Sequence, residues 1–194
     1  MTQNEKHHLL IVGLGNPDKA YEETPHNLGR FCVSRYAEAL GFSDFTAEKK
    51  FNALVSSGLL HEQRIMAQLP ETFMNNSGQA VLAISHFYNI SPTHIWIVHD
   101  DIDLPLGSVR VAFGGGSAGH HGVESISQKL GEAHFWRFRI GIAPEKALEI
   151  PLDAYVLKKG VIDAKATENI ISRTAYLLTL ALEKGIEEAQ KQSD

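Results

Sequence analysis

A histidine, an aspartate and two asparagines are the residues of this 194-residue chain best suited to chemistry. His26 follows Thr24-Pro25, a pair typical of a helix start. A histidine in the first helical turn faces the positive end of the helix dipole, which favours the neutral imidazole that can take a proton from water as a general base. On the local pattern alone, an exposed histidine that only begins a helix is the commoner interpretation.

Asp100 directly follows Ile95–His99, which is predicted to be a short buried strand. The carboxyl ends of strands carry the sites of many α/β folds. A carboxylate at this position could bond one imidazole nitrogen, fix the tautomer and stabilise the protonated ring. Asp101 and Asp103 are close acids, so the three could instead form a solvated acidic loop.

Asn16 and Asn75 carry uncharged amides, which both donate and accept hydrogen bonds. Such groups can hold a carbonyl, orient a water molecule and polarise a developing oxyanion without competing as bases. Asn16 precedes a proline, and Asn75 lies in a Met-Asn-Asn-Ser-Gly stretch. Both patterns are also typical of turns, so a structural role is an alternative for each.

Five blocks of sequence follow one another along the chain. They are Gly13-Leu14-Gly15-Asn16-Pro17 with Tyr21 and Thr24-Pro25-His26-Asn27-Leu28-Gly29; Thr72-Phe73-Met74-Asn75-Asn76-Ser77-Gly78; His99-Asp100-Asp101-Ile102-Asp103-Leu104-Pro105-Leu106-Gly107; Gly114-Gly115-Gly116-Ser117-Ala118-Gly119-His120-His121-Gly122; and Arg137-Phe138-Arg139-Ile140-Gly141-Ile142. In this order they resemble the bacterial peptidyl-tRNA hydrolase family over about residues 9–157.

The resemblance implies hydrolysis of the ester that joins a peptide to the 3′-terminal ribose of tRNA, a reaction that recycles tRNA from stalled translation. It implies His26 as the base and Asp100 as its partner, with no metal or organic cofactor. The resemblance further implies that the scissile carbonyl is positioned by Asn16, Asn75 and His121. It implies that tRNA or its terminal nucleotide is contacted by Tyr21 and Phe73. Met74 would form an active-site wall, and Arg139 would belong to a site for the tRNA 5′-phosphate.

Four positions depart from the family pattern. Pro25 replaces an arginine, His121 replaces an asparagine, and Ala112 and Glu124 replace lysines. The two lost lysines remove positive charge where phosphate is expected to bind, so we expect an intact hydrolytic set and a weakened hold on tRNA. Two alternatives stay open: a non-catalytic RNA-binding relative, which would not need His26 and Asp100 together, and a hydrolase of a smaller N-blocked aminoacyl ester.

Other chemistries have weaker support in the sequence. Gly13-Leu14-Gly15 lacks the third glycine of a dinucleotide loop, and Gly114–Gly122 lacks the Gly-Lys-Ser/Thr ending of a phosphate loop. Ten histidines raise the possibility of a metal site, but none has a strong ligand spacing. Cys32 is the only cysteine, which excludes an intramolecular disulfide and favours a core position.

The composition is that of an ordinary globular protein, 43% hydrophobic and 21% charged, with a formal net charge of −5. No apolar run approaches the ~20 residues that span a bilayer. Residues Met1–His8 lack a signal-peptide core. We therefore expect a cytoplasmic protein that does not bind membranes. The resemblance implies peptidyl-tRNA as its partner, and we expect a monomer that does not bind DNA.

The elements that must position these residues follow from the alternation of apolar runs with helical periodicity, which predicts an α/β fold. We expect residues 1–194 to form a single domain with a twisted mixed sheet and helices on both faces. Strands are predicted over 9–14, 53–60, 64–69, 95–99, 109–113 and 135–142, the second and third forming a hairpin. Helices are predicted over 24–41, 78–88, 123–130 and 163–189, with a loop over 144–152 and a frayed end over 190–194.

Overall fold

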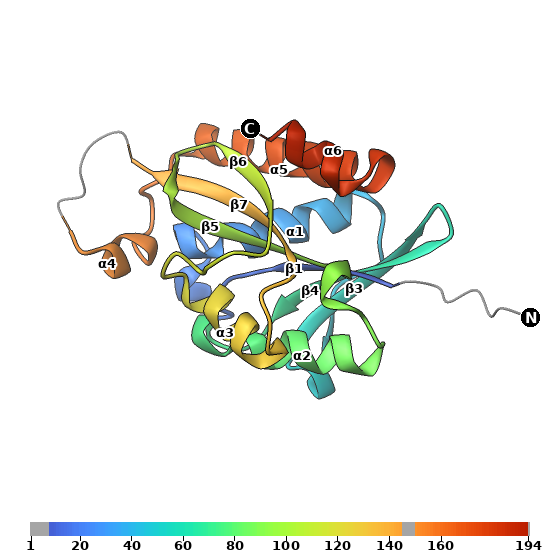
Figure 1. The fold of residues 1–194 in the computed structure, drawn as a ribbon. Coiled ribbons are helices and arrows are strands. Elements are labelled where there is room, and N and C mark those ends of the chain that lie inside the picture. The colour runs from blue at the N-terminus through green and yellow to red at the C-terminus, as the bar shows by residue number, and fades with distance from the viewer. Residues whose placement is uncertain (1–7, 145–149, 194) are drawn as a thin grey trace, which may run out of the picture.

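The computed structural model describes residues 8–144 and 150–193, whose seven strands form one sheet with helices on both faces (Figure 1). The strands are β1 (Leu9–Gly13), β2 (Thr46–Glu48), β3 (Ala53–Leu60), β4 (Gln63–Pro70), β5 (Ile95–Pro105), β6 (Val109–Phe113) and β7 (Trp136–Ala143). The α-helices are α1 (Leu28–Ala39), α2 (Ser77–Phe87), α3 (His121–Leu130), α4 (Leu152–Val156), α5 (Ala164–Lys184) and α6 (Ile186–Lys191). Short 3₁₀ turns are η1 (Lys19–Tyr21), η2 (Pro25–Asn27), η3 (Lys49–Phe51), η4 (Met74–Asn76) and η5 (Pro92–His94).

The sheet has the strand order β2-β3-β4-β1-β5-β7-β6. Its centre is parallel from β4 to β7, and antiparallel strands complete both edges. Alternate residues of β1 face opposite cores: Leu9 and Ile11 pack in a core with residues of α1 and α5, and Leu10 and Val12 in a core with residues of α2 and α3. The predicted fold class, a mixed sheet in a single α/β domain with helices on both faces, is confirmed.

The predicted hairpin is present as β3 and β4, joined by His61 and Glu62. Both residues have positive φ, 47° and 67°, as a tight two-residue hairpin turn requires. The predicted helices at 78–88 and 123–130 correspond to α2 and α3. The short strand β2 and the helix α4 were not predicted.

Strand β5 is longer than the sequence indicates. It runs to Pro105 because β7 pairs alongside it, with Asp100 opposite Ile140 and Asp101 opposite Gly141. Asp100 and Asp101 are therefore buried inside a strand, and the solvated acidic loop is wrong for both. The acidic side chains give no local indication of a strand. The strand is stabilised by its backbone pairing with β7, which is distant in sequence.

The predicted helix start at Thr24-Pro25 is also different in the structure. Pro25 begins the η2 turn, and α1 begins only at Leu28. Helix α1 lies directly on β5, since a Cβ on Gly29 would meet the Val98 carbonyl oxygen at 2.1 Å. This close approach buries the preceding turn, so His26 is 8% exposed and not the exposed helix-start residue that the sequence predicts.

The long C-terminal helix is interrupted at Gly185, whose φ of 95° ends α5 and redirects the chain into α6. The predicted frayed end is wrong as far as Ser193, because its Oγ accepts a hydrogen bond from Val111 N–H on the edge strand β6. Residues 145–149 of the predicted loop, and Asp194, lie outside the described residues. Among the described residues, none of the helices is long and apolar enough to cross a membrane.

Candidate active site

The η2 turn and strand β5 bring His26 and Asp100 together, although 74 positions separate them in the chain. Nδ1 of His26 lies 3.0 Å from each carboxylate oxygen of Asp100. A carboxylate accepts, so Nδ1 carries the proton and donates it. The other ring nitrogen, Nε2, is then left with its lone pair free to act as a base.

A second histidine that the site prediction did not include, His120, binds the same carboxylate. Its Nε2 lies 3.0 Å from Oδ1 of Asp100. Its Nδ1 accepts hydrogen bonds from the backbone N–H groups of Gly122 and Val123 at 3.1 and 3.3 Å, so His120 is the N-cap of α3. The sequence carried one signal for this role: His120 lies just ahead of a predicted helix, after a glycine-rich run.

The environment of Asp100 favours its ionised form. Burial alone would raise the pKa of this carboxyl, but the His120 and His26 rings, which both donate to it, outweigh burial and hold its pKa well below the usual range. His99 contacts both Asp100 and His120. Its Nδ1 donates to the Asp100 carbonyl oxygen at 2.7 Å, and the centre of its ring lies 4.8 Å from that of the His120 ring. Burial, and then the proximity of His120, lower the pKa of His99 well below its ordinary value.

His26, Asp100 and His120 also form a potential metal-ligand group, with ligand atoms all within 4.8 Å of one another. The hydrogen bonds argue against that use. A metal at Nε2 of His120 would displace the proton there, and a neutral ring would then carry its proton on Nδ1, facing the two N–H donors of α3. The arrangement of these three side chains therefore suits hydrogen bonds to Asp100 better than coordination of a metal ion.

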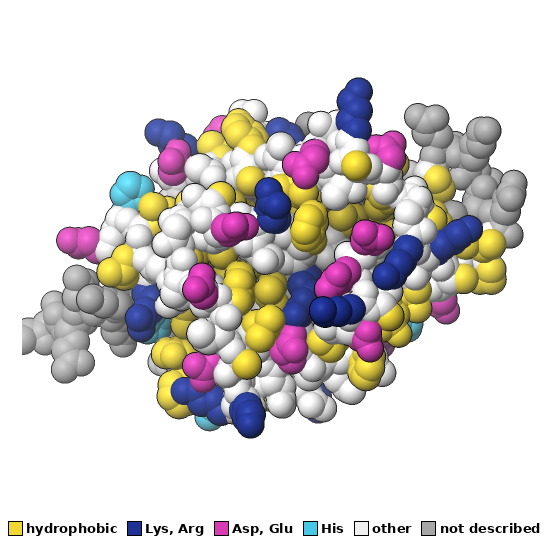
Figure 2. Space-filling model, turned by 180° about the vertical axis from the view of Figure 1, so that it is seen from behind, with side chains coloured by type: hydrophobic (Ala, Val, Ile, Leu, Met, Phe, Trp, Pro, Cys, Tyr) yellow, Lys and Arg dark blue, Asp and Glu magenta, His cyan; other side chains and the backbone are white. Residues whose placement is uncertain are grey.

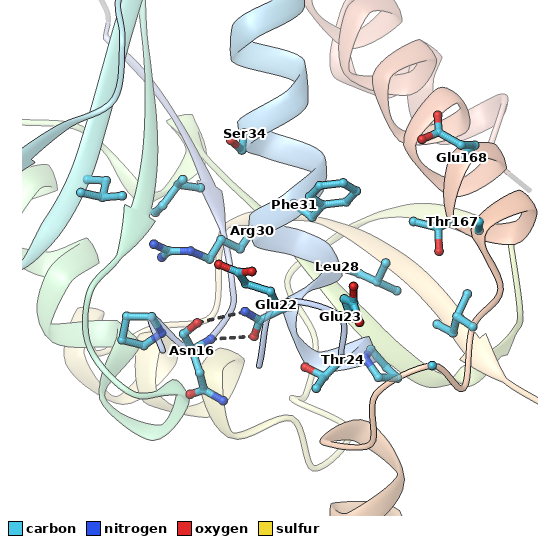
Figure 3. A pocket seen from close by; sticks show the side chains of 18 of the residues that line it. Asn16, Glu22, Glu23, Thr24, Leu28, Arg30, Phe31, Ser34, Thr167 and Glu168 are labelled. Atoms are coloured by element: carbon cyan, nitrogen blue, oxygen red, sulfur yellow. Dashed lines mark hydrogen bonds between the residues drawn. The ribbon is translucent and has the colours of Figure 1, made fainter. Parts of the chain in front are cut away.

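Asn16 is held by two of the site's neighbours. Its backbone N–H donates to Asn27 Oδ1 at 2.8 Å, and its carbonyl accepts from Asn27 Nδ2 at 2.9 Å, the pair of bonds drawn beside Asn16 in Figure 3. Its own Oδ1 accepts from Met74 N–H at 2.9 Å, which leaves Nδ2 as a donor. Asn75 directly follows Met74 in η4 and is exposed, so the bond from Met74 to Asn16 brings the two predicted asparagines into one region of the structure.

The remaining residues predicted to contact the substrate differ in their burial and in whether they line the pocket at His26. A small pocket of about 50 Å³ is lined by His26, Asp100, His121 and the glycine-rich loop. Met74 is buried and packs on Gly122. Phe73 is 57% exposed. Tyr21, in η1, is partly buried and does not line this pocket.

The predicted phosphate residue Arg139 is oriented by an acid. Its Nε donates to Asp101 Oδ2 at 2.7 Å, and Arg110 lies opposite it in the β6–β7 ladder. Ala112 instead lies opposite Arg137, which is buried. Arg137 donates to the carbonyls of Gly114 and Gly116, so it holds the glycine-rich loop that carries His120 and is not free to bind phosphate.

Comparisons with known proteins agree on one family. The family model described as peptidyl-tRNA hydrolase matches residues 10–194. The chain is similar to a peptidyl-tRNA hydrolase of Thiobacillus denitrificans, 44% identical over 91% of this chain and 84% of the relative, and to one of Nocardia farcinica, 37% identical over 94% of each. It is also similar to the crystal structure of the Acinetobacter baumannii peptidyl-tRNA hydrolase, with a TM-score of 0.86 and 31% identity over 98% of this chain and 96% of that one.

Proposed function

The chain belongs to the peptidyl-tRNA hydrolase family, and we propose that His26 carries its reaction, the hydrolysis of the ester that joins a peptide to the 3′-terminal ribose of tRNA. The observation that supports this role is the contact of His26 Nδ1 with Asp100, which directs the basic Nε2 away from the carboxylate. Such a contact fixes the tautomer and stabilises the ring once it is protonated.

The reaction then runs in two steps. Nε2 of His26 takes a proton from a water molecule, whose oxygen attacks the ester carbonyl and forms a tetrahedral oxyanion. The amide nitrogens of Asn16 and Asn75, with His121, donate hydrogen bonds to the carbonyl and to the charge that develops on it. Collapse of the intermediate breaks the bond to the ribose oxygen, which leaves with the proton held by His26.

Asp100 and His120 act on this chemistry indirectly. Asp100 holds the ring of His26 and balances its positive charge during the reaction. His120 donates a further hydrogen bond to Asp100, and Arg137 holds the loop from which His120 projects. None of these steps uses a metal ion or an organic cofactor.

The hold on tRNA rests on few cations. In this proposal Arg139, which is bonded to Asp101, and its neighbour Arg110 contact a phosphate, the exposed Phe73 stacks on a base, and Tyr21 is a further tRNA contact. Ala112 and the exposed Glu124 supply no positive charge. On the face seen in Figure 2, which is the back of the view in Figure 1, Lys and Arg side chains are interspersed with Asp and Glu. We expect weak binding by a cytoplasmic monomer that does not bind DNA.

One pair of substrates tests the proposal. Turnover of N-acetyl-aminoacyl-tRNA is compared with that of a short N-blocked aminoacyl ester without the tRNA body, for the parent and His26→Ala. We expect hydrolysis of the tRNA substrate that depends on His26. Equal turnover of the short ester would favour the smaller-ester hydrolase, and RNA binding without hydrolysis would favour a non-catalytic relative.

A further inference from the structure

A cavity of about 740 Å³ lies behind the turn that carries His26 (Figure 3). Its walls come from the chain around η1 and η2, from α1, from β3 and β4, and from the start of α5. Pro25 and Asn27 line it, whereas His26 between them lines the small pocket with Asp100. The η2 turn therefore separates the two cavities. We call the larger one the α1 groove.

The α1 groove offers apolar surface to a ligand. Its large apolar lining side chains are Leu28, Phe31, Phe45, Leu54, Leu69 and Ile162. Phe31 projects from α1 on the side toward α5 and is 39% exposed, which is unusual for a large apolar side chain. The volume lies within the ~300–1,000 Å³ of small-molecule sites. The groove therefore suits the apolar body of a small molecule.

The charges around the groove are acidic. Glu22 and Glu23 come from the chain before η2, and Glu168 from α5. Within the described residues, no cationic side chain forms an ion pair with any of these three carboxylates.

Arg30 is the only cation among the described lining residues, and its guanidinium already donates to Glu71 and to the Pro70 carbonyl. Its charge is therefore compensated by Glu71. The groove attracts a cation and repels a phosphate or carboxylate.

We propose that the α1 groove is a ligand site, distinct from the His26–Asp100 pocket, for small amphipathic cations: molecules that carry a protonated amine on an apolar body. The apolar body lies against Phe31 and Leu28, the amine pairs with Glu168, and Glu22 and Glu23 add to the negative charge of the groove. This site goes beyond the proposed function and does not depend on hydrolysis.

The groove is connected to the catalytic residues through Asn27. Asn16 and Asn27 both line the groove, and two hydrogen bonds join them. A ligand in the groove should therefore perturb the backbone amides of Asn16 and Asn27 as well as that of Phe31. The shift of Phe31 distinguishes the groove from the His26 pocket as the place of binding, because Asn16 and Asn27 adjoin both.

The test is a titration of the isotope-labelled full chain near pH 7, followed by NMR. Three probes share one apolar body: 4-phenylbutylamine, 4-phenylbutanol and 4-phenylbutyrate. We expect the amine to bind about fivefold more tightly than the alcohol, from one partly exposed ion pair, and the carboxylate to bind least. Equal affinity for amine and carboxylate, or shifts confined to residues around His26, would overturn the proposal.

Variants locate the site. Glu168→Gln should remove most of the advantage of the amine over the alcohol, whereas Glu183→Gln, on the same helix outside the groove, should preserve it. Ser34→Trp should fill the groove and weaken all three probes, with thermal unfolding as the check on its fold. Unchanged amine binding in Glu168→Gln and in folded Ser34→Trp would contradict the assignment.

Discussion

The η2 turn and the glycine-rich loop each deliver a histidine to the same carboxylate, and they deliver it in opposite orientations. His26 meets Asp100 through Nδ1, and His120 meets it through Nε2, both at 3.0 Å. Both rings are largely buried. Distance and burial therefore do not distinguish the proposed base, His26, from its neighbour.

The difference lies in the second nitrogen of each ring. For His26, no backbone donor to that nitrogen occurs among residues 8–144 and 150–193, and the residue lines a pocket. In His120 it accepts from two backbone N–H groups at the start of α3. The comparison teaches that a histidine beside a carboxylate is a candidate base only where its far nitrogen remains available, and the flanking secondary structure decides this.

The largest effect is expected from His26→Ala. Removing the proton acceptor should lower turnover of peptidyl-tRNA by ~10²–10⁴-fold. Thermal unfolding of the variant separates lost chemistry from lost folding, because the side chain is buried. Turnover within a few-fold of the parent would show that His26 is not the base. The comparison with His120 would then not identify a catalytic residue.

Asp100→Asn should have an effect of the same order, since an amide presents one acceptor oxygen to two N–H donors and leaves His26 free to change tautomer. The loss should fall on kcat more than on KM. Asp101→Asn is the matched control, because Asp101 binds Arg139 and neither histidine. A larger loss of kcat in the control would assign the partner role to Asp101.

The effect of Asp100→Asn on stability should depend on pH. Folding lowers the pKa of Asp100, so its ionisation contributes stability that is fully present above the ordinary carboxyl value of about 4 and is lost as the pH falls further, toward the folded-state pKa. The difference in free energy of unfolding between the parent and Asp100→Asn should therefore shrink below about pH 4. Chemical denaturation across this range measures it, and a difference that grows in acid would mean that folding raises this pKa instead.

His120→Asn sharpens the comparison. Asparagine can still cap α3 but is too short to reach Asp100, so turnover should fall about tenfold, as for one lost hydrogen bond to a charged group. In a His26→Ala background the same change should have no further effect on rate. His134→Asn, a change at an exposed histidine, is the control. An additive loss in the double variant would mean that His120 acts independently of His26.

Charges outside the two histidines should affect binding and not chemistry. Ala112→Lys with Glu124→Lys should lower KM for peptidyl-tRNA a few-fold and steepen its dependence on salt, because each new phosphate contact releases counterions. Turnover at saturation should stay unchanged. If neither KM nor its salt slope moves, the acceptor end of tRNA does not pass over these two residues.

The smallest expected effect is that of a chelator. Removing divalent ions with EDTA should leave kcat unchanged on a substrate whose RNA needs no magnesium, because the fixed tautomer of His120 opposes a metal in the His26–Asp100–His120 group. The control restores magnesium alone. Activity that is lost with EDTA and returns only with zinc would identify His26 and His120 as metal ligands.

The sequence by itself determined the layers of this protein and the family to which it belongs. Apolar runs of four to eight residues and helical stripes depend on local periodicity, so the strands around Ile11, Val111 and Phe138 and the helices α2 and α3 could be predicted directly. The order of the motif blocks was sufficient to indicate the family. The break at Gly185 was not predicted, because the helical stripe continues past this glycine to about residue 189.

Only the tertiary structure decided how the site is assembled. The burial of His26 depends on the contact of Gly29 with the Val98 carbonyl, and the extension of β5 through Asp100 depends on its pairing with β7. The positions of His120 and Arg137 depend on bonds between a loop and distant elements. Local sequence encodes which face of an element is apolar, but a hydrogen bond between residues 74 positions apart exists only after packing has brought their elements together, so no local pattern could specify it.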